Sequence, residues 1–211
     1  MTSGRSGLAG WSLVCWLLTL GMAQGSVGPV PAQRLPFTLI PPSERWEVGL
    51  SGHLIGTLRR AAEQGDPEAQ YDLGVLHERG EGMPVSLGEA ERWYRLAAEQ
   101  GFAMAQYNLG VLCIEGEGVR RRDGEGVKWF RLAAEQGMAE AQFNLGVMYQ
   151  AGRGVTRDVT QAYAWIALAA SGGIEQAGVW LVFLERVMTA QQRLRARRLV
   201  ENWQPVQVVD H

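Results

Sequence analysis

The pentapeptide AAEQG decides the fold of this 211-residue chain. It occupies residues 61–65, 97–101 and 133–137, and successive copies begin 36 residues apart. A degraded copy, AASGG at residues 169–173, keeps the same interval. Self-similarity at a fixed period of about 20–50 residues is typical of stacked supersecondary units. The chain is therefore predicted to be an array of repeated units.

One unit, residues 66–101, carries the signals of two helices. Asp66 is a suitable N-cap, and apolar residues then recur at helical spacing until Gly80 ends the first helix. After a GEG turn, Ser86 and Glu89 have the S-x-x-E spacing of a capping box for a second helix. Each helix has one apolar stripe, which only a neighbouring helix can bury. The unit is predicted to be a helix-turn-helix hairpin, with AAEQG ending its second helix.

The remaining chain continues the pattern in both directions. Repeats two and three are residues 102–137 and 138–173, with the Leu-Gly pair, the second-helix Trp and the turn glycines at matching positions. The flanking parts are an N-terminal capping helix (49–65), a degenerate C-terminal capping repeat (174–203) and a tail (204–211). Terminal units of such arrays are expected to be atypical, since one face meets water. The fold class is predicted to be all-α, a solenoid with a 36-residue period.

The repeated pattern AxYNLGVLYxxGxGVxxDxxxAxxWxxLAAEQG resembles the Sel-1-like repeat family, which is related to the tetratricopeptide repeats. The resemblance covers about residues 50–203. It implies a right-handed superhelix used for protein–protein interaction, in bacteria often exported. It implies no enzyme motif. This chain departs from some family members by lacking their cysteine pairs.

The N-terminus has the character of an export signal. Residues 1–25 combine one basic residue, a short apolar run from Leu8 to Leu20 and small residues suited to cleavage. Residues 26–48 follow as a proline-rich extended linker. The chain is expected to be periplasmic or secreted, without a stable membrane span after cleavage. An uncleaved signal anchored in the inner membrane is the alternative.

Composition argues against several function classes. A net charge of −2 gives no whole-chain signature of nucleic-acid binding, and the three histidines suggest no catalytic constellation, so no enzyme activity and no cofactor are expected. His77 and Cys113 share one repeat position, but the next equivalents are Tyr149 and Glu185, which favours packing residues over a metal site. Arginine clusters at 120–122 and 193–198 are interpreted as solvated faces, with an acidic partner or anionic lipid as the alternative.

The geometry of the first helix of each repeat predicts a partner-binding row. About 100° per residue places one face of these helices opposite the packing stripe, and tetratricopeptide relatives use that face as a concave groove. The row is predicted to contain Tyr71, Asp72, Val75, Tyr107, Asn108, Val111, Phe143, Asn144 and Val147. Val179, Trp180 and Phe183 would continue it in the fourth unit. The alternative interpretation is that the aromatics pack between helices and the asparagines bond neighbouring backbone.

These observations favour a non-catalytic interaction scaffold, an adaptor or regulator that binds a protein or peptide segment in its concave face. The asparagine amides offer donors and acceptors to the backbone of an extended ligand. A cell-wall or polysaccharide-associated protein that stacks sugars on the groove aromatics is the alternative. Self-association is possible, and residues 26–42 could themselves occupy the groove.

Overall fold

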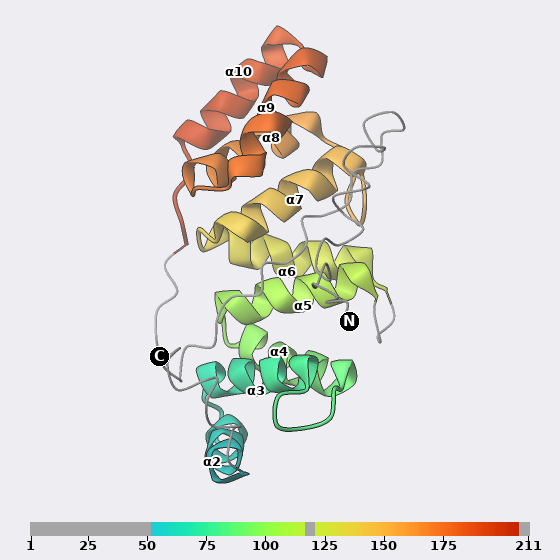
Figure 1. The fold of residues 1–211 in the computed structure, drawn as a ribbon. Coiled ribbons are helices and arrows are strands. Elements are labelled where there is room, and N and C mark those ends of the chain that lie inside the picture. The colour runs from blue at the N-terminus through green and yellow to red at the C-terminus, as the bar shows by residue number, and fades with distance from the viewer. Residues whose placement is uncertain (1–51, 117–120, 207–211) are drawn as a thin grey trace, which may run out of the picture.

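The computed structural model describes residues 52–116 and 121–206 as a curved stack of helices (Figure 1). The predicted export signal, linker and most of the tail lie outside these ranges, as does Arg120. The part of the chain that is described contains nine helices and no strand. They are α2 (Gly52–Glu63), α3 (Pro67–Arg79), α4 (Leu87–Glu99), α5 (Ala103–Glu115), α6 (Asp123–Glu135), α7 (Ala139–Ala151), α8 (Val159–Ser171), α9 (Glu175–Val187) and α10 (Ala190–Glu201). The prediction of an all-α solenoid is confirmed.

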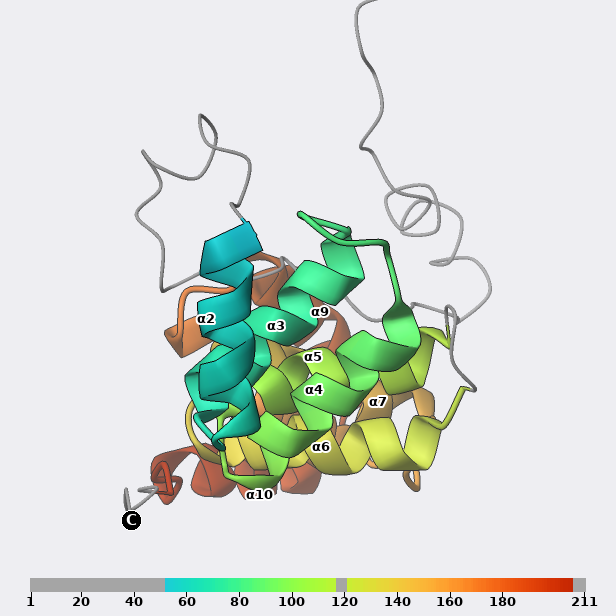
Figure 2. The ribbon, with the colours of Figure 1, turned by 90° about the horizontal axis from the view of Figure 1, so that it is seen from below.

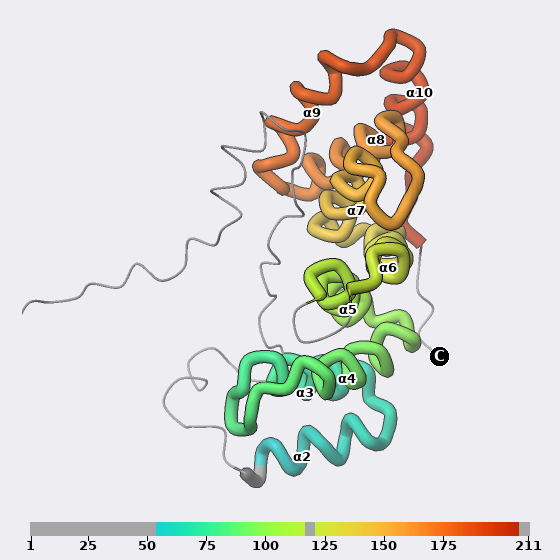
Figure 3. Tube along the Cα trace, turned by 90° about the vertical axis from the view of Figure 1, so that its right-hand side faces the viewer, coloured from blue at the N-terminus to red at the C-terminus, as the bar shows by residue number. Residues whose placement is uncertain are grey.

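Three hairpins form the body of the array: α3 with α4, α5 with α6, and α7 with α8. We call the first helix of each hairpin its A helix and the second its B helix. Seen from the side, α5 and α7 run along one side of the stack, and α6 and α8 run along the other (Figure 3). A view along the stack shows the helices lying over one another (Figure 2). Ten consecutive residues are buried in α5 and again in α7, so every face of these A helices is covered.

The AAEQG segment ends α2, α4 and α6, as predicted, and in two copies its glutamine also bonds the two helices of one hairpin together. Its glycine has φ of 99°, 92° and 95° in the three copies, a region that favours glycine and turns the chain into the next A helix. Its glutamine reaches the adjacent A helix: Gln100 Nε2 donates to Gln70 Oε1, and Gln136 Nε2 donates to Gln106 Oε1, both at 2.8 Å. The repeated phrase is thus a turn and a polar latch together.

A second glutamine contact recurs in the A helices, where the side chains are buried. The Nε2 atoms of Gln70, Gln106 and Gln142 donate to the carbonyls of Ala62, Ala98 and Ala134, at 3.0, 3.1 and 3.2 Å. Each bond joins an A helix to the end of the preceding B helix. Because it satisfies a buried polar pair at each of the first three junctions along the stack, it stabilises the stacking of successive units.

Close helix packing within each hairpin depends on one glycine. A Cβ built on Gly74 would lie 2.6 Å from the Tyr94 ring, and one on Gly110 would lie 2.7 Å from the Phe130 ring. In the third hairpin the corresponding distance, from Gly146 to Cγ1 of Ile166, is 2.5 Å. Real Cβ contacts are never this short, so a side chain here must displace the B helix.

The interior is divided into two hydrophobic clusters. The N-terminal cluster extends from Ala62 to Cys113, and the C-terminal cluster extends from Tyr107 to Ala196. Helix α5 belongs to both: Leu109 and Leu112 lie in the first cluster, whereas Val111 and Ile114 lie in the second. The array is therefore two cores joined through one helix.

The last unit does not form the hairpin of the other three. Only two residues connect α9 to α10, and Met188, at the end of α9, is extended (φ −84°, ψ 142°) where earlier A helices end in a left-handed glycine. Val182 occupies the position of the close-packed glycine, where its side chain is exposed. Within the described chain α10 packs against α8, and its contact with α9 is weak. Thr189 and Gln192 form a capping box at the start of α10.

The chain beyond α10 returns to the middle of the array. The backbone N–H of Val206 donates to the carbonyl of Glu135, at the end of α6, at 2.7 Å. Trp203 is half-buried against the C-terminal cluster. Its ring lies close to Gly137, 3.7 Å from the position that a Cβ on this glycine would take. We refer to residues 202–206 as the C-terminal strap.

Candidate functional site

The nine residues of the predicted partner-binding row are all buried in this structure. The row does bring together equivalent positions of α3, α5 and α7, as the helical period predicts. Its members do not form an open surface. Their role toward a ligand stays a prediction, and the structure adds a description of what each side chain contacts.

The aromatic members of the row pack between helices. The Tyr71 ring lies 5.7 Å from that of Tyr94 and 5.4 Å from that of Phe102, measured between centroids. Tyr107 lies 5.8 Å from Phe130, and Phe143 meets Trp180 edge-on at 6.1 Å. These separations are typical of favourable ring pairs in protein cores. The aromatics therefore contribute to the packing, in agreement with the alternative interpretation of their pattern.

Each tyrosine of the row faces an asparagine of the following repeat. The amide of Asn108 lies near the Tyr71 hydroxyl and that of Asn144 near the Tyr107 hydroxyl, where each acts to lower the tyrosine pKa. Burial has the larger effect and raises the pKa of Tyr71 to about 12, helped by the negative charge of Asp72. It raises the pKa of Tyr107 further. In the third repeat the row has Phe143, which lacks a hydroxyl, and the next unit supplies Trp180 in place of an asparagine.

Several polar atoms of the row are buried without a hydrogen-bond partner in the described ranges. They are the hydroxyl of Tyr71, Nδ2 of Asn108, and both Nδ2 and Oδ1 of Asn144. The asparagines come close to the tyrosines without reaching hydrogen-bond geometry. An unsatisfied buried polar group costs about 1–3 kcal/mol, so a repeated row of them requires an explanation.

The fourth unit does not continue the row as predicted. Trp180 is buried against Phe143, but Val179 and Phe183 are exposed, unlike the buried side chains at the same positions of the first three repeats. The difference arises because no further A helix packs on α9 within the described chain, and α10 packs on α8 instead.

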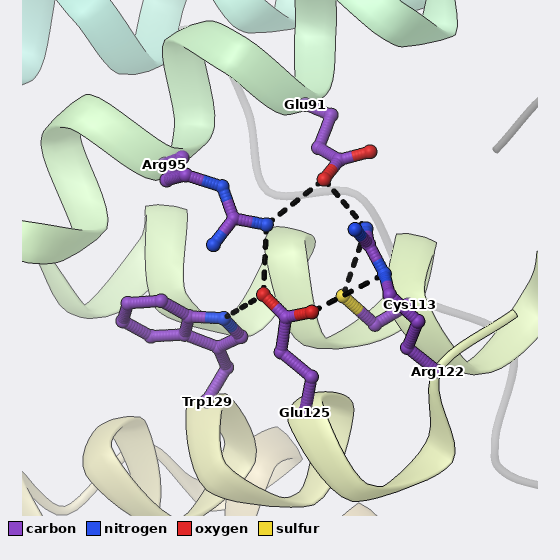
Figure 4. A network of polar contacts seen from close by, with 6 residues as sticks. All are labelled: Glu91, Arg95, Cys113, Arg122, Glu125 and Trp129. Atoms are coloured by element: carbon purple, nitrogen blue, oxygen red, sulfur yellow. Dashed lines mark hydrogen bonds and ion pairs between the residues drawn. The ribbon is translucent and has the colours of Figure 1, made fainter. Parts of the chain in front are cut away.

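A network of charges between repeats one and two was not predicted from the sequence. Figure 4 shows Arg95 of α4 bridging Glu91, at 2.9 Å, and Glu125 of α6, at 2.7 Å. Arg122, just before α6, contacts the same two carboxylates. Burial acts to raise the pKa of Glu91, but hydrogen bonds from Arg122 and Arg95 outweigh it, and the pKa is lowered. The helical spacings of Glu91 with Arg95 and of Arg122 with Glu125 are visible in the sequence and indicate an ion pair within each repeat. The contacts between the two pairs, which join the repeats, leave no such signal.

The neighbouring basic cluster is largely used inside the molecule. Arg121 pairs with Asp123 at 2.8 Å, and Arg153 of the next repeat approaches the same carboxylate at 3.2 Å. Together they hold the pKa of Asp123 at about 2, against the opposing effect of its partial burial. In the second cluster Arg193 donates to the carbonyls of Glu185 and Met188 at the end of α9. These arginines therefore stabilise loops and helix ends.

The position shared by His77 and Cys113 carries no metal cluster. In the two described ranges, no three metal-ligating side chains converge. Cys113 is buried, and this burial raises the pKa of its thiol. The helices of the same ranges are all too short or too polar to cross a membrane.

Comparisons with known proteins agree with this architecture. A solved Sel1 repeat protein from Oxalobacter formigenes is 34% identical with a TM-score of 0.61, over 66% of this chain and 57% of that one. A protective antigen with an SLR fold, c5321 from uropathogenic Escherichia coli strains, is 30% identical with a TM-score of 0.53, over 71% of this chain and 40% of that one. This chain thus spans less than two thirds of either. A search of the curated proteins found no match.

The match to the Sel1 repeat family model covers residues 67–102, 103–138 and 139–174. These three segments are the three hairpins with the turns that follow them. The chain belongs to the Sel1 repeat family.

Proposed function

We propose that this protein is a non-catalytic scaffold that holds an extended segment of a partner protein along its A helices. Sel1 repeat proteins generally mediate protein–protein interaction, and the proposal adds a binding mode to that general role. The N-terminal pattern supports action after export, in the periplasm or outside the cell.

The observation that carries the proposal is the row of unpartnered amides. Asn108 and Asn144 occupy the same place in successive repeats, and Nδ2 of both, with Oδ1 of Asn144, is buried without a hydrogen-bond partner in the described chain. A primary amide donates and accepts, as a peptide backbone does. Packed helices lie about 8–10 Å apart, close to three residues of extended chain at about 3.3 Å each. One extended segment can therefore satisfy both amides in register.

Because the row is buried, the ligand must enter by widening the array. The curvature of a solenoid is set by small rotations between repeats, so a modest change at each junction opens one face. The sugar-stacking alternative finds no support in the ring contacts, since Tyr71, Tyr107 and Phe143 already pack against other rings.

The test is the double substitution Asn108→Ala and Asn144→Ala. Protein captured by the exported chain, identified by mass spectrometry, is expected to be lost, because the ligand backbone loses both partners. The variant is expected to unfold at no lower temperature than the wild type, because removing buried unpartnered amides relieves a cost of about 1–3 kcal/mol each, which offsets the cavities that remain.

The matched control is Asn202→Ala, which removes the same side chain at the C-terminal end of α10, outside the row. It is expected to retain the captured protein. Capture that survives the double substitution contradicts the proposal, as does a partner that disappears after muramidase treatment. Loss of folding would assign the asparagines a structural role.

A further inference from the structure

One face of α9, which no other helix of the described chain covers, is a second surface with the features of an interface. Its four large apolar side chains are well exposed: Val179 at 60%, Val182 at 55%, Phe183 at 45% and Val187 at 54%. On the opposite side Ala177, Trp180 and Leu184 are buried, so the helix is firmly held. Contiguous exposed apolar side chains on a rigid element indicate an interaction site.

This face exists because the terminal hairpin fails to close. In the first three repeats the equivalent of Val182 is a glycine in contact with the B helix, whereas here α10 packs on α8. In Figure 3, α9 lies at the end of the stack, on the side of α5 and α7. A helix from outside the molecule can therefore pack on α9 without displacing α10 from α8.

We propose that this surface binds the same surface of a second copy, with the two α9 helices antiparallel. A two-fold axis midway between residues 180 and 181 pairs three sets of positions at once. Glu175 faces Arg186 of the other copy, and Val179 faces Val182. Phe183 faces Gly178, where a Cβ would meet nothing within 4 Å, so the ring has room.

The charges favour a second copy over an unrelated helix. Apart from Gln176 at its edge, the exposed residues between Glu175 and Arg186 on this face are apolar or glycine, and these two charges, of opposite sign, lie at opposite ends. An antiparallel copy brings each Glu175 carboxylate to one Arg186 guanidinium, which gives two symmetric charge pairs in the dimer. Isologous contacts of this kind give closed dimers, the commonest soluble assembly.

The first test is the mass of the full chain in solution, by sedimentation velocity over a concentration series. The wild type is expected to sediment as a dimer of the 23.2 kDa chain. Phe183→Asp is expected to weaken dimerisation at least tenfold, whereas Val85→Asp, which adds the same charge at an exposed loop valine, is expected to leave it unchanged. A monomeric wild type overturns the proposal, as does a dimer that survives Phe183→Asp.

The second test uses charge reversal, which does not alter the apolar contacts. Glu175→Arg alone and Arg186→Glu alone are each expected to be monomeric, because like charges then face each other. An equimolar mixture of the two variants is expected to restore the dimer as a heterodimer. A mixture that stays monomeric overturns self-pairing. A wild type that is monomeric and uses α9 to bind phospholipid vesicles or another protein also overturns it.

Discussion

At the scale of single residues, the buried tyrosines are the most informative titrating groups. Tyr71, Tyr94 and Tyr107 lie in the interior, and burial raises the pKa of each hydroxyl, for Tyr71 to about 12. In the unfolded chain the tyrosine pKa is about 10. Between these values the unfolded state releases a proton that the folded state retains, so the free energy of unfolding falls as pH rises.

Tyr71→Phe is expected to remove the contribution of one titrating proton from the pH dependence of the free energy of unfolding. Below pH about 10 the variant should be more stable than the wild type by about 1–3 kcal/mol, because the Tyr71 hydroxyl is buried without a hydrogen-bond partner in the described chain, and repeat three has Phe143 at this place. Between pH 10 and 12 its slope should be shallower by about 1.4 kcal/mol per pH unit. Urea unfolding at a series of pH values measures both slopes, and equal slopes would contradict a retained proton on Tyr71.

At the scale of the helical hairpin, the glycine of the A helix controls how closely the two helices approach. A Cβ on Gly146 would lie 2.5 Å from Cγ1 of Ile166 and 3.0 Å from the Ala162 carbonyl. Neither neighbour can move without shifting α8. The same glycine is absent from α9, the one A helix whose hairpin does not close.

Gly146→Ala is therefore expected to destabilise the protein by about 1–3 kcal/mol, the usual cost of overpacking. Gly56→Ala, in the exposed capping helix α2, is the matched control because a Cβ there meets nothing within 4 Å. It should stabilise by about 0.5–1 kcal/mol through helix propensity. Denaturant unfolding measures both, and equal effects of the two substitutions would show that close packing is not limiting.

The hairpins were predictable because local signals recur: an apolar stripe and a closing glycine in each, and a side-chain N-cap at α3, α4 and α8. The row of Tyr71, Asn108 and Asn144 was predictable only as a shared face, since helical period says which residues align and not what covers them. The departure of α10 was not predictable, because its direction depends on a two-residue connection and on the fit of Ala196 against the C-terminal cluster. Neither the short connection nor the fit of Ala196 produces a periodic pattern in the sequence.

At the scale of the whole molecule, the two hydrophobic clusters are coupled through α5 and through the charge network of Figure 4. Arg95 extends from α4 to Glu125 of α6 and thereby links the two halves. Nearest-neighbour interfaces set how cooperatively a repeat array unfolds. The network should therefore affect how strongly the unfolding of one half is coupled to that of the other, and it should affect the stability of each half less.

Arg95→Met is expected to speed hydrogen exchange in α3 and α4 relative to α7 and α8, corresponding to about 1 kcal/mol of lost coupling. Exchange followed by mass spectrometry resolves the two halves. Arg92→Met is the control, since Arg92 lies on the same helix but pairs only with Glu89 of α4 among the ion pairs described. A uniform change across the chain would show that Arg95 supports overall stability and not the link.

The C-terminal strap gives this array a property that an open solenoid lacks. The hydrogen bond from Val206 to Glu135 works as a clasp, because it fastens the segment that follows α10 to a point two units back. An unclasped stack can peel from its free end one layer at a time. Here the outermost helices are expected to unfold together, because the strap ties them to α6. The part of the molecule that carries the exposed α9 surface therefore stays folded until the bond between Val206 and Glu135 breaks.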